Sequence, residues 1–160
     1  MIGLGLSSAA GAWYSPSTMV EADVGYAIFA VTADKGIHAW GPDLPEVFRQ
    51  AALGLWSLMV DPATVRPRRE VPLTAEAGDR EALLVAWLNE LLYLYEAHGF
   101  VAADCAVRVV TEHAVSAVVR GEDANPDRHV KIGHVKAATY HLLRVAPGAR
   151  GWEAQVVVDV

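Results

Sequence analysis

The sequence is poor in cysteine and in positive charge. Its 160 residues include one cysteine, Cys105, which excludes a disulfide within the chain and a zinc site built from several cysteines. The 13 Lys and Arg residues are outnumbered by 19 Asp and Glu residues, and the formal net charge is −6. A broad basic face that neutralises nucleic-acid phosphates is therefore not expected. We predict a cytoplasmic protein with no disulfide-linked partner and no strong direct binding to nucleic acid.

Long hydrophobic runs and early positive charges are also missing. The first Lys or Arg is Lys35, so the amino end has no charged region typical of a secretory signal. The early apolar run at residues 2–6 is far shorter than the roughly 20 residues that a membrane span needs. We expect no membrane attachment. Residues 1–24, rich in Gly, Ser and Ala, are predicted to form a poorly specified extension, and residues 25–160 a single domain.

Apolar residues are abundant and follow regular patterns. They make up 53% of the chain, against 20% charged residues, which suits one packed domain. Helical spacing predicts amphipathic helices at 44–60, capped by Asp43, and at 79–97, ended by Gly99. Eight extended patterns lie at 25–31, 36–40, 66–73, 101–111, 113–120, 130–137, 139–145 and 152–160, and we expect about seven of them to be strands of the sheet. The pattern predicts an α+β domain, with two helices packed on a largely antiparallel or mixed sheet.

The chain ends inside an apolar strand pattern, Val-Val-Val-Asp-Val. Termini are ordinarily polar and frayed. Here the Asp159 side chain and the free α-carboxylate of Val160 are neighbours, and two adjacent negative charges in a buried strand need a positive counter-charge. Ca²⁺ and Mg²⁺ favour carboxylate oxygens, so the segment points to a divalent cation. The alternative interpretation is a solvated terminus whose charges are simply hydrated.

Several segments follow one another in an order that is typical of a known family. They are 32–41 (TADKGIHAWG), 51–61 (AALGLWSLMVD), 87–94 (WLNELLYL), 121–122 (GE), 127 with 129 (Asp and His), 135–141 (VKAATYH) and 157–160 (VVDV). This ordered set, from about residue 26 to the last residue, resembles the archease family. The resemblance implies a small metal-binding helper protein of the RNA ligase of tRNA splicing.

The resemblance also implies functional residues. Asp34 from the Thr-Ala-Asp segment, Asp159 and the terminal Val160 correspond to the family's metal site. The expected cofactor is a divalent cation, calcium in the first place, with magnesium and manganese as alternatives. Lys136 corresponds to a functional lysine, and Glu122 is a weaker accessory candidate. Without the resemblance, Asp34 would be read as a turn residue and Lys136 as one half of a salt bridge.

The chain departs from the family pattern at two positions beside Asp34. Val31 stands where the family has a histidine, and Lys35 stands where it has Val or Ile. An ammonium group at Lys35 could compete with the cation. Asp23, in an upstream Ala-Asp-Val-Gly segment, is a decoy for Asp34, but the Ala-Trp-Gly segment that should follow the metal-binding aspartate comes after Asp34.

The expected function is activation of the tRNA-splicing and RNA-repair ligase, rather than catalysis. By resemblance, the protein would promote guanylylation and multiple turnover of the ligase, and would widen its use of nucleoside triphosphates. Two alternatives remain open: a metal-dependent phosphohydrolase that uses the same acidic cluster, and a chaperone-like module. The spacing of the histidines fits no zinc motif, and no Gly-rich phosphate loop is present. Arg66, Arg68 and Arg69 form a small basic edge that we interpret as solvated surface.

Overall fold

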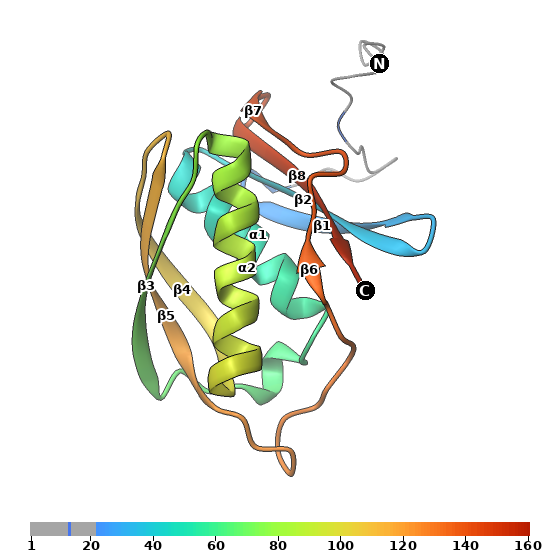
Figure 1. The fold of residues 1–160 in the computed structure, drawn as a ribbon, viewed down its shortest axis with the longest axis vertical. Helices are drawn as coiled ribbons and strands as arrows, with labels where there is room; N and C mark the ends of the chain where they lie inside the picture. The colour runs from blue at the N-terminus through green and yellow to red at the C-terminus, as the bar shows by residue number, and fades with distance from the viewer. Residues whose placement is uncertain (1–12, 14–21) are drawn as a thin grey trace.

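The structure is a computed structural model that describes residue 13 and residues 22–160. The extension predicted at residues 1–24 therefore lies largely outside the described residues. In the described part, eight strands form two sheets whose pairings are all antiparallel (Figure 1). The five-stranded sheet consists of β1 (Gly25–Val31), β2 (Asp34–Gly41), β6 (Ala137–Ala138), β7 (Arg144–Gly148) and β8 (Gly151–Asp159). The three-stranded sheet consists of β3 (Arg69–Glu76), β4 (Phe100–Val110) and β5 (Ala114–Asp123).

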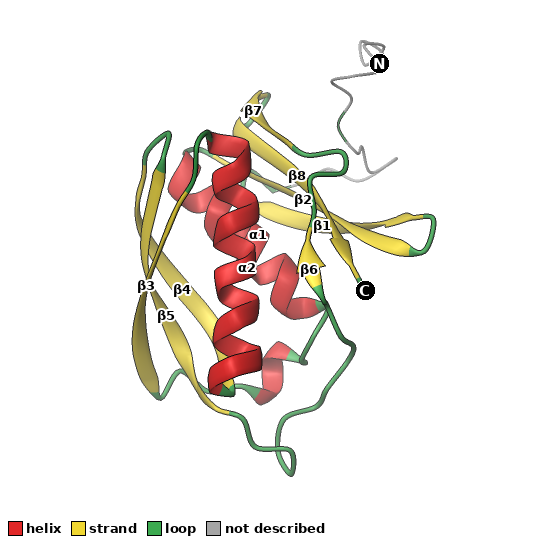
Figure 2. Ribbon diagram, viewed as in Figure 1, coloured by secondary structure: helices red, strands yellow, loops and turns green. Residues whose placement is uncertain are grey.

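The two predicted helices lie between the sheets (Figure 2). Helix α1 (Leu44–Ser57) contacts β2 on one side and β4 on the other, and α2 (Arg80–His98) contacts β3 and β6. A short 3₁₀ helix, η3 (Pro62–Thr64), follows α1. The predicted α+β class with two helices is confirmed, and its strands divide into two sheets. No helix among the described residues has the length and apolarity needed to cross a membrane.

The helix ends follow their sequence signals. The Asp43 side chain accepts a hydrogen bond from the backbone N–H of Glu46 over 3.0 Å, which is the predicted cap of α1. Asp79 accepts from the N–H of Ala82 over 2.7 Å at the start of α2. Gly99 ends α2 with φ 60°, a left-handed conformation that glycine adopts without steric cost.

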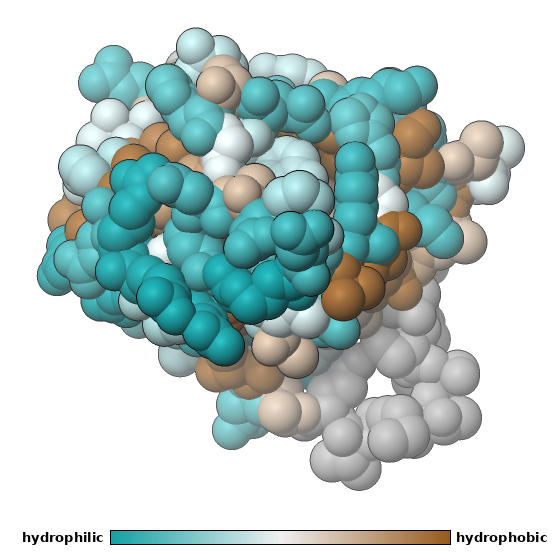
Figure 3. Space-filling model, turned by 90° about the horizontal axis from the view of Figure 1, so that it is seen from below, coloured by the Kyte–Doolittle hydropathy of each residue, from teal (hydrophilic) through white to brown (hydrophobic). Residues whose placement is uncertain are grey.

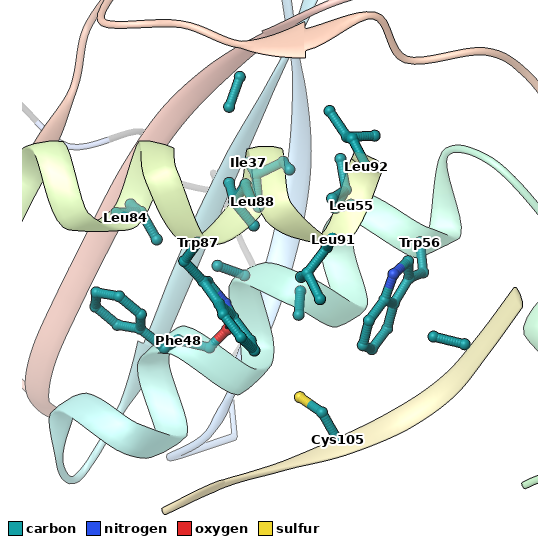
Figure 4. Packing of buried hydrophobic residues seen from close by; sticks show 14 of the residues in the cluster. Ile37, Phe48, Leu55, Trp56, Leu84, Trp87, Leu88, Leu91, Leu92 and Cys105 are labelled. Atoms are coloured by element: carbon teal, nitrogen blue, oxygen red, sulfur yellow. The ribbon is translucent and has the colours of Figure 1, made fainter. Parts of the chain in front are cut away.

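The core is the layer where the helices meet both sheets (Figure 4). Trp87 of α2 is fully buried, and its indole N–H donates to the backbone oxygen of Phe48 on α1 over 3.0 Å. Cys105 of β4 lies in the same core. Burial raises the pKa of the Cys105 thiol to about 12, so the thiol is protonated and unreactive at neutral pH.

The strands predicted at 130–137 and 139–145 are largely wrong. Residues 124–136 form no strand apart from an isolated bridge at Lys131, because their backbone binds the segment that follows α1: Ile132 donates to the oxygen of Met59, and Asp61 donates to the oxygen of Val130, both over 2.8 Å. Of residues 130–143, only Ala137 and Ala138, which form β6, pair with β8. Residues 139–143 form a turn in which Leu142 has φ 54°, and β7 begins at residue 144. The prediction failed because the apolar residues of this stretch are spaced as in a strand, although most of them are not paired in a sheet.

Candidate metal centre

The end of the chain lies beside the hairpin that joins β1 to β2, and Figure 1 shows both on the same side of the molecule. In the pairing of β2 with β8, Lys35 lies opposite Val158. One step further, the backbone N–H of Val160 donates to Oδ1 of Asp34 over 3.4 Å, across 126 positions of sequence. We refer to Asp34, Asp159 and Val160 as the C-terminal corner.

Strand register places the two aspartates on one face of the sheet. Continuing the β2–β8 register by one pair puts Asp34 opposite Asp159. Residues that face one another across an antiparallel pair have neighbouring side chains, and like charges at such positions are destabilising. Both aspartates are half-buried, and Val160 is 37% exposed. A cation at the corner would offset this repulsion and would remain accessible from solvent.

The same register separates Lys35 from the aspartates. Successive strand residues point to opposite faces, and Lys35 pairs with Val158, one position away from both Asp34 and Asp159. The ammonium group of Lys35 therefore belongs to the other face of the sheet. This arrangement does not favour competition between the Lys35 ammonium group and a cation for Asp34. Val31, in the position of the family's histidine, pairs directly with Asp34 across the hairpin.

The hairpin that presents Asp34 is strained. Val31 and Asp34 are paired, which leaves Thr32 and Ala33 as a two-residue loop. Such tight hairpin loops need positive φ angles, which glycine and asparagine supply most readily. Thr32 has φ 46°, an unfavourable value for a β-branched residue. Strain of this kind persists only where the surrounding structure enforces it, and it marks the turn before Asp34 as a constrained element.

Strand β6 holds the final strand from the other side. The backbone N–H of Lys136 donates to the oxygen of Asp159 over 2.8 Å, and the Thr139 hydroxyl donates to the oxygen of Val157 over the same distance. Asn89 of α2 accepts from the N–H of Ala138 over 2.9 Å and thereby ties β6 to the helix. Sequence reasoning missed Thr139 and Asn89 as supports. In the sequence, each of them is marked only as a polar residue inside an otherwise apolar segment.

The Lys136 side chain is exposed, and its backbone adjoins the corner through the hydrogen bond to Asp159. Within the described residues, Glu122 forms its ion pairs with Arg68, Arg128 and His129, and Lys136 is not among them. No ion pair within 4.0 Å joins Lys136 to either aspartate in this part of the chain. The salt-bridge interpretation of Lys136 is therefore not favoured by the geometry, and its ammonium group is free to meet an external anion.

Glu122 lies elsewhere, at the end of β5 in the three-stranded sheet. Its buried carboxylate accepts two hydrogen bonds from Arg128, at 2.8 and 2.7 Å, and one from the Arg66 backbone at 2.8 Å. The ring of His129 lies 2.8 Å away. Hydrogen bonds from Arg128 and then from His129 hold the pKa of Glu122 well below its ordinary value. None of these contacts involves the C-terminal corner.

The donor set of the corner suits a hard cation. Two carboxylate side chains and one terminal carboxylate offer only oxygen atoms, which Ca²⁺, Mg²⁺ and Mn²⁺ accept. Among the described residues, no three His, Cys, Asp or Glu side chains gather as a metal-binding group. A cation at the corner would therefore depend on Asp34, Asp159 and the end of the backbone, with water completing its six to eight ligands if it is calcium.

Comparison with known proteins places the chain in a family. Residues 26–160 match the model of the archease protein family. The chain is 41% identical over 135 residues to the protein archease of Methanosarcina acetivorans, a match that covers 81% of this chain and 91% of the relative. It is 40% identical over 134 residues to the protein archease of Thermococcus kodakarensis, with 81% and 94% covered.

A solved structure agrees with the sequence matches. The solution structure of Methanobacterium thermoautotrophicum protein 1598 superposes with a TM-score of 0.72 at 30% identity, and the match covers 85% of this chain and 99% of that one. The family match includes both helices, all eight strands except the first residue of β1, and every residue of the C-terminal corner.

Proposed function

The chain belongs to the archease family, and from this premise we propose that it binds a divalent cation at its C-terminal corner and activates the RNA ligase of tRNA splicing and RNA repair. Its partner in this proposal is the ligase protein. The cation is calcium, with magnesium and manganese as alternatives. The expected effect is faster guanylylation of the ligase's active-site histidine, multiple turnover, and wider use of nucleoside triphosphates. The protein itself is not an enzyme in this proposal.

The observation that carries the proposal is the meeting of Asp34 with the end of the chain. The Val160 N–H lies 3.4 Å from Oδ1 of Asp34, and the register sets Asp159 beside it. The Asp34 carboxylate and the last residues of the chain, 126 positions apart in sequence, thus meet at an accessible edge of the sheet. This convergence supports a site for an external positive charge, because the described part of the chain brings no Lys or Arg into an ion pair with them.

The residues around the corner have distinct tasks in this proposal. Asp34, Asp159 and the terminal carboxylate hold the cation, and the β6 contacts of Lys136 and Thr139 keep the last strand in place. When bound, the cation supplies positive charge that can orient and neutralise phosphate groups. The exposed ammonium of Lys136 adds a second positive group for a phosphate in the partner's active site.

The proposal is tested by ligation assays with the purified ligase under multiple-turnover conditions. The wild-type protein should raise turnover, and the Asp34→Asn and Asp159→Asn variants should lose about tenfold or more of this stimulation, the loss typical of a damaged metal site. Asp23→Asn is the matched control, because it makes the same chemical change in the upstream Ala-Asp-Val-Gly segment. It should stimulate as the wild type does.

The assays also separate the alternatives. Full stimulation by both corner variants would contradict the site. Turnover of GTP by the isolated protein that a chelator abolishes would instead favour the phosphohydrolase, and stimulation that is independent of both metal and Val160 would favour a chaperone-like module. For the proposed activator we expect no ligation and no GTP hydrolysis by the protein alone.

A further inference from the structure

A second site candidate lies far from the C-terminal corner in the fold, where β5 ends and β3 begins. The structure has a hollow of about 460 Å³ there, lined by Arg68, Arg69, Arg128, Glu122 and Asp123 among others. Figure 3, which views the molecule from below, shows strongly hydrophilic side chains gathered around a hollow on this face. The basic edge that the sequence suggested is therefore part of a concave surface, which Arg128 completes from the following loop.

Arg128 is fixed in the wall of this hollow, which we call the arginine pocket. Its two terminal nitrogens bind both oxygens of Glu122 at 2.8 and 2.7 Å, and one of them also lies 3.3 Å from the oxygen of Thr64. Glu122 is only 4% exposed and stays ionised, because its hydrogen bonds hold its pKa low. Its negative charge is thus neutralised within the wall, and it serves as an anchor for Arg128 rather than as a repulsive charge in the pocket.

Arg68 and Arg69 supply two accessible guanidinium groups. The Arg68 side chain is 61% exposed, and its Nε lies 3.6 Å from Oε1 of Glu122, beyond hydrogen-bond distance. Arg69 is half exposed and pairs over 2.7 Å with Asp123, whose side chain is 77% exposed. Exposed ion pairs of this kind are weak and exchange readily for a better partner. An incoming anion can therefore be bound by both groups without disturbing the fold.

A more apolar hollow of about 340 Å³ adjoins the arginine pocket, and Arg69 lines both. Pro72 of β3 with Glu90, Tyr93 and His98 of α2 contribute to its wall, so that the hollow suits the base rather than the phosphate groups of a ligand. Tyr93 is 59% exposed, and the His98 ring meets it edge-on with the centroids 5.5 Å apart. An exposed aromatic ring in the same hollow as the Arg69 guanidinium suits a ligand that carries a flat ring next to its negative charge, since nucleobases stack on such rings.

We propose that the arginine pocket binds the phosphate groups of a nucleotide, whose base lies in the adjoining Tyr93 hollow. Arginine matches phosphate geometry with paired N–H donors, and three guanidinium groups outnumber the two carboxylates of the pocket in an otherwise acidic protein. Together the two hollows have a volume suited to a small ligand. The nucleotide can be free or part of an RNA strand, because both present phosphate groups and a base to the site. This site is separate from the C-terminal corner and does not depend on the metal.

The test is a calorimetric titration of the full-length protein in the presence of a chelator, which removes any contribution from a metal. The probes are GTP, inorganic pyrophosphate and a short single-stranded RNA. We expect saturable binding with one site, and about tenfold weaker binding after Arg68→Gln, the loss expected for one charged hydrogen-bonding partner. Arg108→Gln is the matched control, because it removes the same charge from an exposed position of β4 outside the pocket.

Further variants fix the position of each part of the ligand. Tyr93→Ala should weaken GTP several-fold and leave pyrophosphate unchanged, whereas Asp34→Asn should change neither. Tighter binding of RNA than of GTP would identify the strand as the source of the phosphate, and the reverse would identify the free nucleotide. The proposal is overturned by the absence of saturable binding at millimolar GTP, by an equal loss in Arg68→Gln and Arg108→Gln, or by equally tight binding of an acidic peptide.

Discussion

The molecule contains two carboxylate centres of opposite character. At the end of β5, the buried Glu122 is surrounded by Arg128, His129 and a backbone N–H from its own chain. At the C-terminal corner, the half-buried Asp34 accepts a hydrogen bond from the backbone N–H of Val160, and strand register sets the half-buried Asp159 opposite it. The sequence offered both centres as functional candidates, and only the structure separates them.

The difference shows what makes a carboxylate structural. Glu122 has its counter-charges built in, so its ionised form stabilises the fold without any ligand. The C-terminal corner sets Asp34 opposite Asp159 without a positive side chain of its own in the described part of the chain, and the proposed cation would offset the repulsion between the two carboxylates. A variant at the first centre should therefore damage folding, and a variant at the second should damage ligand binding. The following experiments test that division.

The largest effect should follow Glu122→Ala. Removing the carboxylate leaves the Arg128 guanidinium and the Arg66 N–H without their main partner. We expect the melting temperature to fall by roughly 10 °C, the order found when one partner of a buried ion pair is lost. Differential scanning calorimetry measures the shift. Asp123→Ala, which alters only an exposed pair with Arg69, is the control and should change little; an equal shift in both variants would contradict the structural role of Glu122.

A smaller shift should come from the cation at the C-terminal corner. A ligand at about 100 times its dissociation constant stabilises a folded protein by about 2.7 kcal/mol, which for this chain length is a rise of roughly 5–10 °C. Calcium should raise the melting temperature of the wild type but not of Asp159→Asn. In chelator the variant should melt at or above the wild-type temperature, because one repulsive charge is gone. If calcium still raises the melting temperature of Asp159→Asn, the corner carboxylates do not bind the ion, and the proposed contrast with Glu122 is wrong.

Acid should weaken the Glu122 centre gradually. The pKa of Glu122 is held below its ordinary value by Arg128 and His129, so the unfolded state binds more protons in acid than the folded state. The stabilisation is complete above the ordinary glutamate pKa of about 4.3 and is lost as pH falls through the lower folded pKa. Urea unfolding between pH 6 and 3 should show a steeper loss for the wild type than for Glu122→Gln. If the free energy of unfolding depends equally on pH in the two proteins, the ionisation of Glu122 is not coupled to folding.

The smallest effect concerns the strained turn before Asp34. Thr32 has φ 46°, which asparagine tolerates better than a β-branched residue. Thr32→Asn should therefore raise the free energy of unfolding by about 1 kcal/mol. Chemical denaturation measures this gain, and Ala33→Asn, in the other loop position, serves as the comparison. A loss of stability in Thr32→Asn would contradict the strain.

Local signals predicted the helices well and the C-terminal half of the sheet poorly. Asp43 and Gly99 mark helix ends by side-chain and backbone chemistry that acts within a few residues, so their structure could be read directly. Residues 130–145 have a strand-like composition, yet the tether from Ile132 to Met59 is a long-range contact without a local signature. In that segment, long-range hydrogen bonds rather than the local strand pattern determine the backbone conformation.

The candidate site was likewise predictable from local signals and not from long-range contacts. The unusual end of the chain pointed to Asp159 and Val160, and the family resemblance added Asp34, which the structure brings to Val160. Residue types alone did not reveal that Arg128 neutralises Glu122, because that pairing depends on how the loop after β5 turns back. Nor did they reveal that alternation along β2 assigns Lys35 to the face opposite Asp34.

A structure determined from crystals grown with millimolar calcium tests the central claim most directly. We expect one ion bound by oxygen atoms of Asp34, Asp159 and Val160, at the distances of about 2.3–2.6 Å that calcium requires. No ion at that position, with the two aspartates turned away from the end of the chain, would contradict it.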